Sequence, residues 1–391
     1  MNILLIVDDY LPHSIKVAAK MMHELAQELM TQGHVVTVLT PSSSLKRRCS
    51  LEKIDGVSVL YFRSGKIKNT NKIRRAVNES LLSFRAYWSC AEFFKSNPQD
   101  LIVAYSPSIF FGHLVARLKK LWNAQSYLIL RDFFPQWAID SELMKEGSLI
   151  HKYFQFFENK NYSVADRIGI MSPSNERYFR ESEFSEKVEV LYNWVKPMEY
   201  QREDDYWRDK YNLKNKTVFF YGGNIGFAQE MKCLLDLAFE LRGHPEAMFI
   251  FVGDGDEVPL LKGLVAEHKL TNVLIFPPVD QKTYLEMLNE ADVGLIHLNR
   301  NHTSHNFPGK VLSYFNLNKP VLGAVNVGND LKDVINKANA GYISDSGDLG
   351  SLKENALRLL SAKNRKQKGE NGKKLLLELF DVQVTAQKIT H

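Results

Sequence analysis

Lys310 is the residue whose type and place in the chain point most directly to chemistry. It follows Phe307-Pro308-Gly309, in which proline suits the first position of a helix and glycine allows a ligand to approach closely. A cation in the first turn opposes the helix dipole unless an anion compensates it. We therefore predict that Lys310, with the backbone N–H groups of residues 309–311, binds an anionic ligand.

A second candidate anion site is the glycine-rich segment Tyr221-Gly222-Gly223-Asn224-Ile225-Gly226. It follows an apolar run, and we expect it to open a helix whose free N–H groups face a phosphate. Gly253-Asp254-Gly255 follows the next apolar run in the same way. Lys16 lies beside the first predicted helix, where anions also bind. No glycine stands between Asp8 and Lys16 and no P-loop motif occurs, which argues against nicotinamide and P-loop enzymes.

Charged residues also end an apolar run in the first half of the chain. Arg131 and Asp132 directly follow Tyr127-Leu128-Ile129-Leu130. Such a pair could orient the acceptor substrate of a transfer reaction. A structural ion pair is the alternative interpretation. His297, His302 and His305 lack the spacing of a metal site with a carboxylate, so we expect no bound metal.

Apolar runs that alternate with helical patterns must position these residues, and they predict parallel sheets covered by helices. Residues 195–215 interrupt the rhythm with a polar stretch, which indicates a boundary. We predict one α/β domain over residues 1–196, a second over 197–379, and a final segment, 380–391, that crosses back to the first. Two doubly wound domains would leave a cleft between the carboxyl ends of their strands.

Composition narrows the function classes. The chain has 391 residues, 45% of them apolar, and a formal charge of +5 that resides in the first half. Residues 46–75 include ten basic residues and only two acidic ones, Glu52 and Asp55. Such a cluster fits contact with an anionic membrane surface, or simply a solvated surface. Interleaved stacking motifs are missing, so we expect no nucleic acid. Three scattered cysteines fit a reducing cytosol, and no apolar run is long enough to span a membrane.

Together these segments resemble the GT-B glycosyltransferases of family 4, the retaining group, over nearly the whole chain. The likeness rests on four strings, namely Tyr10-Leu11-Pro12, Arg131-Asp132-Phe133-Phe134-Pro135, Gly222-Gly223-Asn224-Ile225-Gly226 and Gly253-Asp254-Gly255-Asp256-Glu257. Within that family, residues 224–229, 302–310 and 328–331 resemble the bacterial L-N-acetylfucosamine (fucosaminyl) transferases of O-antigen and capsule assembly.

The resemblance implies two facing Rossmann-like domains of the α/β class, with the substrates in the cleft between them. It implies transfer of L-N-acetylfucosamine from a UDP-sugar donor to GlcNAc-diphosphate-undecaprenol, by a peripheral cytoplasmic enzyme on the inner face of the bacterial plasma membrane. Asp132 and Arg131 would orient the acceptor and Lys310 would hold the diphosphate, without a metal or other cofactor. The remaining donor contacts would come from Lys16, Gly222, Gly223, Asn224, Gly226, Val279, Arg300, His305, Pro308, Gly309 and Ser313.

The sequence also departs from that family. Its widespread E-x7-E motif would fall at residues 305 and 313, which here are His305 and Ser313. In that family the second glutamate usually binds the donor ribose, so the resemblance leaves open which groups bind the ribose here. Two further functions stay open on this evidence, a UDP-sugar 2-epimerase of the same fold and a catalytically silent partner subunit.

Overall fold

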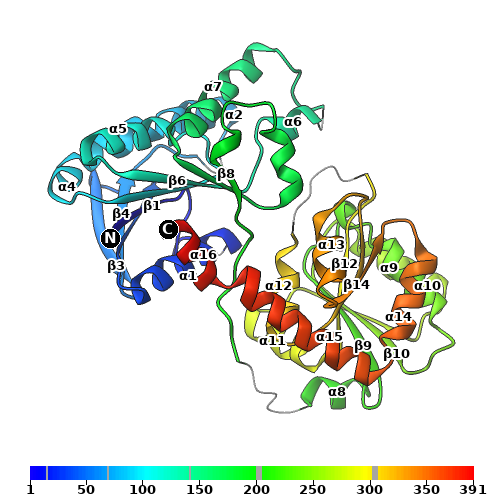
Figure 1. Cartoon of the computed structure of the whole chain (residues 1–391). Coiled ribbons are helices and arrows are strands. Elements are labelled where there is room, and N and C mark those ends of the chain that lie inside the picture. Colours follow the sequence, from blue (N-terminus) through cyan, green and yellow to red (C-terminus); the bar gives the residue numbers. More distant parts are fainter. Residues whose placement is uncertain (15, 68–69, 141, 200–204, 302–306) are drawn as a thin grey trace. The chain divides into compact units, whose positions relative to one another are not determined.

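A computed structural model describes residues 1–14, 16–67, 70–140, 142–199, 205–301 and 307–391 (Figure 1). The chain divides into two compact units, one of residues 1–196 with 382–391 and one of residues 197–381. Each unit contains one sheet of parallel or mostly parallel strands, flanked by helices. The prediction of two Rossmann-like α/β domains is therefore confirmed.

The first unit has an eight-stranded sheet in the order β3-β4-β2-β1-β5-β6-β7-β8. Its strands are β1 Asn2–Ile6, β2 Val35–Ser42, β3 Cys49–Ile54, β4 Val57–Arg63, β5 Leu101–Tyr105, β6 Gln125–Leu130, β7 Arg167–Ile170 and β8 Val188–Val190. Its helices are α1 Val17–Thr31, α2 Lys72–Ser80, α3 Leu82–Ser89, α4 Ala91–Ser96, α5 Gly112–Trp122, α6 Gln136–Asp140, α7 Leu149–Val164 and α16 Val382–Thr390.

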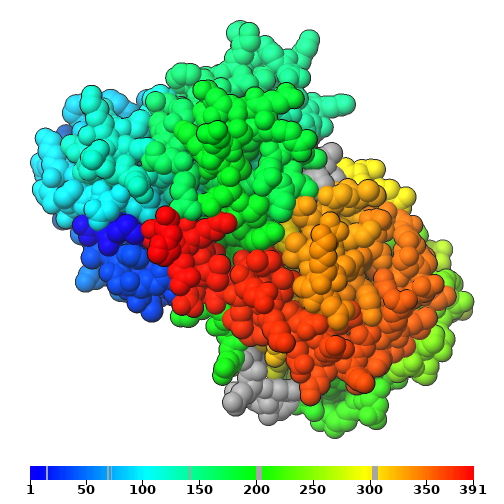
Figure 2. Space-filling view, in the orientation of Figure 1, coloured from blue at the N-terminus to red at the C-terminus, as the bar shows by residue number. Residues whose placement is uncertain are grey.

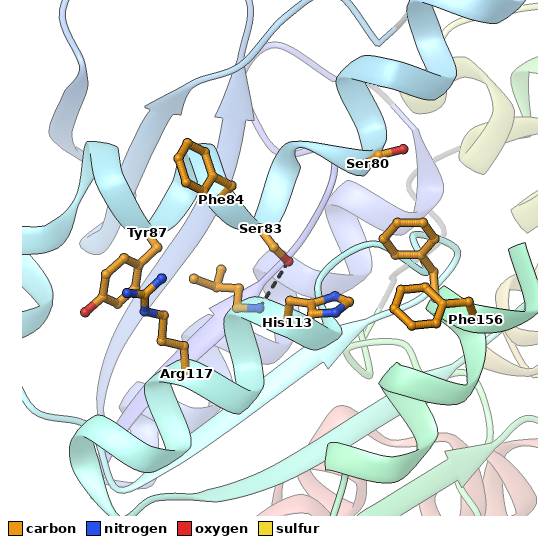
Figure 3. Close-up of a pocket in the computed structure, with 9 residues that line it drawn as sticks. Ser80, Ser83, Phe84, Tyr87, His113, Arg117 and Phe156 are labelled. Atoms are coloured by element: carbon orange, nitrogen blue, oxygen red, sulfur yellow. Dashed lines mark hydrogen bonds between the residues drawn. The ribbon is translucent and has the colours of Figure 1, made fainter. Parts of the chain in front are cut away.

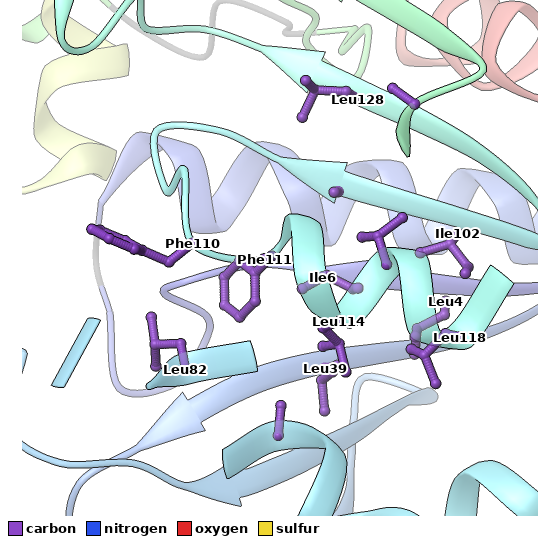
Figure 4. Packing of buried hydrophobic residues seen from close by; sticks show 14 of the residues in the cluster. Leu4, Ile6, Leu39, Leu82, Ile102, Phe110, Phe111, Leu114, Leu118 and Leu128 are labelled. Carbon is purple, nitrogen blue, oxygen red and sulfur yellow. The ribbon is translucent and has the colours of Figure 1, made fainter. Parts of the chain in front are cut away.

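Strand β1 shows why this sheet is covered on both faces. Successive side chains of a strand point to opposite faces. Leu4 and Ile6 accordingly join the apolar cluster beneath α3 and α5, whereas Ile3 and Leu5 join the cluster beneath α1 and α16. Figure 4 shows the first of these clusters. A run that is apolar at every position is thus satisfied only inside a sandwich of helices.

An antiparallel edge strand departs from the all-parallel prediction. Strand β3 pairs antiparallel with β4 through Asp55 and Gly56, both of which have positive φ, at 48° and 86°. Aspartate followed by glycine suits a tight hairpin turn because both residues tolerate this backbone conformation. The sequence pattern missed β3 because none of its residues is buried and it has no continuous apolar run.

The second unit has a six-stranded sheet, all of whose neighbouring strands are parallel, in the order β11-β10-β9-β12-β13-β14. Its strands are β9 Thr217–Gly222, β10 Ala247–Val252, β11 Val273–Phe276, β12 Val293–His297, β13 Val321–Val325 and β14 Gly341–Asp345. Its helices are α8 Tyr206–Lys210, α9 Lys232–Glu240, α10 Val258–Glu267, α11 Gln281–Glu290, α12 Gly309–Asn316, α13 Asp330–Lys337, α14 Leu349–Arg358 and α15 Ala362–Leu375.

The last helix belongs to the first unit although it follows the second in sequence. Val382, Ala386 and Ile389 of α16 are buried in the cluster that α1 covers, and Lys388 donates a hydrogen bond of 2.6 Å to the carbonyl oxygen of Val190. Figure 2 shows α16, in red, beside the blue N-terminal segment. Over the described residues, none of the helices combines the length and apolar character needed to cross a membrane.

Candidate functional site

The carboxyl ends of β9, β10 and β11 form one continuous edge in the second unit. The N–H of Gly223 donates to the carbonyl oxygen of Val252 at 2.9 Å, and the N–H of Gly253 donates to that of Phe276 at 3.2 Å. Ile225 likewise donates to Asp254 at 2.8 Å. These bonds join the glycine segment after β9 to the loops that follow the next two strands.

Two glycines make this close approach possible. Gly223 and Gly253 have φ of 132° and 156°, and a Cβ atom on Gly253 would lie only 1.8 Å from the carbonyl oxygen of Gly223. A side chain at Gly253 would therefore push the two loops apart. The glycines predicted from sequence thus shape the edge by contact between backbones.

Lys310 reaches this edge from α12, the helix that follows β12, and β12 lies beside β9 on the side away from β10. Its Nζ lies 3.6 Å from the centre of the Tyr221 ring, above the end of β9. The same atom would be 3.4 Å from a Cβ on Gly223. The structure therefore brings together the two anion sites that the sequence predicted separately, Lys310 and the glycine segment.

The ammonium of Lys310 lacks a compensating anion within the described part of the chain. None of the described residues makes a hydrogen bond or ion pair with it, and its contact is the aromatic face of Tyr221. Burial lowers the pKa of Lys310 to about 7. Since the shift arises from desolvation of the charged form, a bound anion would favour the protonated lysine.

The helix predicted after the glycine segment is present, but it begins later than expected. A single 3-10 turn, Phe227–Gln229, follows Gly226, and Glu230 then has φ of 46°, so α9 starts only at Lys232. The glycine segment consequently does not lie at a helix N-terminus. Helix α12 provides that feature instead, with Pro308 as its N-cap and Gly309 as its first residue, one position later than predicted.

One of the predicted backbone donors is already bonded. The N–H of Val311 donates to the carbonyl oxygen of Pro308 at 3.0 Å, which removes it from the expected set. A Cβ added to Gly309 would meet no atom within 4 Å, so the approach to the start of α12 is open at that position. Gly309 and Lys310 are therefore the first-turn positions that remain as candidates for an anion.

The other predicted donor contacts are dispersed. The amide of Asn224 donates to Gln229 at 2.7 Å, Arg300 is exposed and lies 3.7 Å from Glu230, and Val279 is half-buried after β11. Ser313 lies one turn further along α12. Gly222 and Gly226 belong to the glycine segment, and His305 falls outside the described residues. Lys16 belongs to the first unit, where its ammonium lies 3.7 Å from Asp9.

In the first unit, Asp132 lies at the carboxyl edge of the sheet, just after β6. Burial raises the pKa of Asp132, although the backbone N–H of Phe133 opposes the shift. Burial raises the pKa of Tyr105, at the end of β5, and the neighbouring Asp8 and Asp132 raise it further. Asp8 and Tyr105 were not predicted as site residues. The signal for Asp8 was its place right after the first apolar run, at the same edge of a parallel sheet.

Arg131 has a different environment from Asp132. Its guanidinium donates to the carbonyl oxygens of Tyr192 at 3.0 Å and Gly169 at 3.4 Å, and lies 5.4 Å from the centre of the Trp194 ring. Burial lowers the pKa of Arg131 to about 10. These contacts join three chain segments beneath the edge, which favours the structural interpretation, while its action on an acceptor stays a prediction.

Comparison with known proteins agrees with this architecture. Residues 18–194 match the glycosyl transferase 4-like domain, and residues 203–375 match the glycosyl transferases group 1 domain. The chain is 25% identical over 221 residues to the probable glycosyltransferase WbjE of Pseudomonas aeruginosa, covering 55% of this chain and 54% of WbjE. It is 24% identical over 224 residues to WcaI of Escherichia coli K12, named as a colanic acid biosynthesis glycosyl transferase, covering 54% of each.

The chain thus spans about half the length of these two curated relatives. A solved structure, Anabaena HepE in complex with UDP, is similar over all of this chain and 98% of HepE, with a TM-score of 0.69 and 15% identity. At that identity the likeness concerns the fold, and it extends over both units.

Proposed function

We propose that this chain, which belongs to the GT-B glycosyltransferases, transfers a sugar from a UDP-sugar to a lipid-linked acceptor. The observation that carries the proposal is the ammonium of Lys310, which lies against the glycine segment without a compensating anion among the described residues. A diphosphate is the anion that such a transferase must hold and then release. The UDP in the structure of HepE supports the choice of nucleotide.

The mechanism follows from charge. As the bond between the sugar C1 and the diphosphate oxygen breaks, negative charge accumulates on UDP, and fixed donors stabilise it most when they are already in place. Lys310 and the N–H groups at the start of α12 would provide that stabilisation without a metal. In a retaining transfer, the departing phosphate oxygen takes the proton of the acceptor hydroxyl while the new bond to C1 forms. Asp132 would orient that hydroxyl.

The donor sugar and the acceptor are proposed from the sequence resemblance, as L-N-acetylfucosamine and GlcNAc-diphosphate-undecaprenol. The name of WcaI, which refers to colanic acid biosynthesis, supports a role in bacterial surface polysaccharide assembly. Lys46, Arg47 and Arg48 are exposed in the first unit, which supports contact with an anionic membrane surface that presents such an acceptor. The enzyme would then be peripheral on the cytoplasmic face.

The test is a panel of UDP-sugars incubated with the purified chain and a synthetic lipid-diphosphate GlcNAc, with products identified by mass and linkage. We expect one UDP-sugar to yield UDP and a disaccharide lipid, only when the acceptor is present. UDP release without the acceptor would favour the epimerase. UDP binding without any product across the panel would favour a silent partner subunit.

A further inference from the structure

Large exposed apolar side chains gather on three helices of the first unit. Helices α2 and α3 expose Ile73, Val77, Phe84 and Trp88, and α7 exposes Leu149, Ile150, Tyr153 and Phe156. Ser80 at the end of α2 contacts Tyr153 of α7 through their hydroxyl groups, so α2 and α7 lie side by side at this point. Exposed apolar area on this scale marks a surface that binds protein, membrane or an apolar ligand.

A groove of about 380 Å³ opens within this surface, between α3, α5 and α7 (Figure 3). Its walls are largely aromatic and come from Phe84, Tyr87, Phe156 and Phe157. The volume lies within the ~300–1,000 Å³ typical of small-molecule sites. An open groove with ring walls suits a flexible hydrocarbon chain, which needs burial from water and no directed hydrogen bonds.

The rim of the groove carries positive charge. The guanidinium of Arg117 stacks 4.0 Å from the centre of the Tyr87 ring, and none of the residues that the structure describes pairs with it in a hydrogen bond or ion pair. Helices α2, α3, α5 and α7 together carry nine Lys or Arg and two acidic residues, Glu79 and Glu158. Glu79 is bonded to Arg75 and Glu158 to Tyr162. Lys119 of α5 pairs with Asp166 outside these helices, and the four helices still carry an excess of cations beside the exposed apolar side chains.

We propose that this groove binds one acyl chain of an anionic membrane phospholipid, with the lipid phosphate at Arg117. The apolar side chains around the groove would enter the headgroup layer, and the cations would contact neighbouring headgroups. Amphipathic helical surfaces that carry both aromatic and basic residues bind membranes in this way. The inference rests on the proposed membrane contact and adds to it a defined lipid site.

Lipid binding in the absence of a bilayer is the discriminating measurement. Dihexanoyl phosphatidylglycerol, kept below its micelle concentration, is titrated calorimetrically into the full chain. We expect saturable binding that Phe156→Ser and the groove-filling His113→Trp weaken by about tenfold or more, a change of about 1.4 kcal/mol. Arg117→Gln should weaken the binding as well, whereas Lys120→Gln, an exposed cation on α5 that does not line the groove, should leave it unchanged.

Co-sedimentation with phosphatidylglycerol and phosphatidylcholine vesicles separates this site from the broader membrane contact. Vesicle binding without monomer binding would contradict the lipid site in the groove and would still support the membrane contact. Monomer binding without vesicle binding would contradict both the membrane contact and the assignment of the groove to a membrane phospholipid. Tighter binding of a short polyprenyl phosphate in the same groove would overturn the assignment to a phospholipid. Circular dichroism of each variant, with Leu260→Ser in the second unit as a surface control, ensures that folded proteins are compared.

Discussion

The sheet edges of the two units hold their half-buried cations in opposite ways. In the first unit, Arg131 is bonded to the carbonyl oxygens of three chain segments. In the second, Lys310 rests on an aromatic ring, and no described residue compensates its charge. A cation whose hydrogen bonds are made within the protein supports the fold, whereas an uncompensated one raises the free energy of the folded state until an anion binds. We therefore interpret the charge of Arg131 as structural and that of Lys310 as functional. Substitution of each residue tests its interpretation.

The largest expected effect concerns Lys310. We expect Lys310→Ala to lower turnover by about 10²-fold or more, the cost of losing one preorganised donor at a developing negative charge. Affinity for UDP should fall as well, and thermal stability should stay the same or rise because a poorly compensated charge is removed. Steady-state kinetics, UDP titration and a melting curve measure the three quantities. Near wild-type turnover would rule out the diphosphate role.

Replacement of Arg131 should show the opposite pattern. We expect Arg131→Met to lower the free energy of unfolding by about 2 kcal/mol or more, since buried carbonyl groups lose their donors. Urea unfolding measures this change, with Arg75→Met as a control because an exposed pair contributes about 0–1 kcal/mol. Full stability combined with lost turnover would instead return Arg131 to the acceptor site that the sequence predicted.

UDP binding at Lys310 should depend on pH. With a pKa of about 7 in the free protein, Lys310 loses its charge as pH rises through that value. Because the protonated form binds the anion, UDP affinity should fall between pH 7.5 and 9.5, by up to about tenfold per pH unit, in a range where the nucleotide phosphate is already ionised. A Lys310→Met variant should bind UDP weakly and without this slope. Equal slopes in both proteins would assign the titration to another group.

Burial of Lys310 also has a consequence for stability. The pKa of this lysine is lower in the folded chain than the ordinary value of about 10.4 in the unfolded chain. The unfolded state therefore holds the proton more tightly between pH 7 and 10, and stability without ligand should rise with pH across that window. Melting curves of wild type and Lys310→Met should converge as pH increases.

The smallest expected effect is that of metal removal. If Lys310 and the first-turn N–H groups supply the positive charge, excess EDTA should leave the rate of transfer unchanged. Loss of activity that Mg²⁺ or Mn²⁺ restores would show that a metal shares the stabilisation of the leaving group. Glycosyl transfer measured with and without chelator decides between these outcomes.

Local sequence was sufficient for the repeating architecture. Apolar runs such as residues 3–6, followed by helical patterns, determine parallel strands buried on both faces, because such runs are stable only between layers of helices. The crossing of the last segment to the first unit was also anticipated, and α16 lies there. The exposed strand β3 and the late start of α9 were missed, since one lacks an apolar run and the other depends on the positive φ of Glu230.

The tertiary structure alone decided what the charged residues contact. Lys310 and Gly223 are far apart in the sequence and meet because β12 lies beside β9, which brings α12 to the glycine segment. Arg131 and Asp132 are adjacent in sequence, yet one side chain bonds to buried carbonyls and the other remains at the edge. Residue type and spacing specify which segments become strands and turns. The partners of a side chain depend on which strand ends become neighbours, and strand order arises only when the whole sheet assembles.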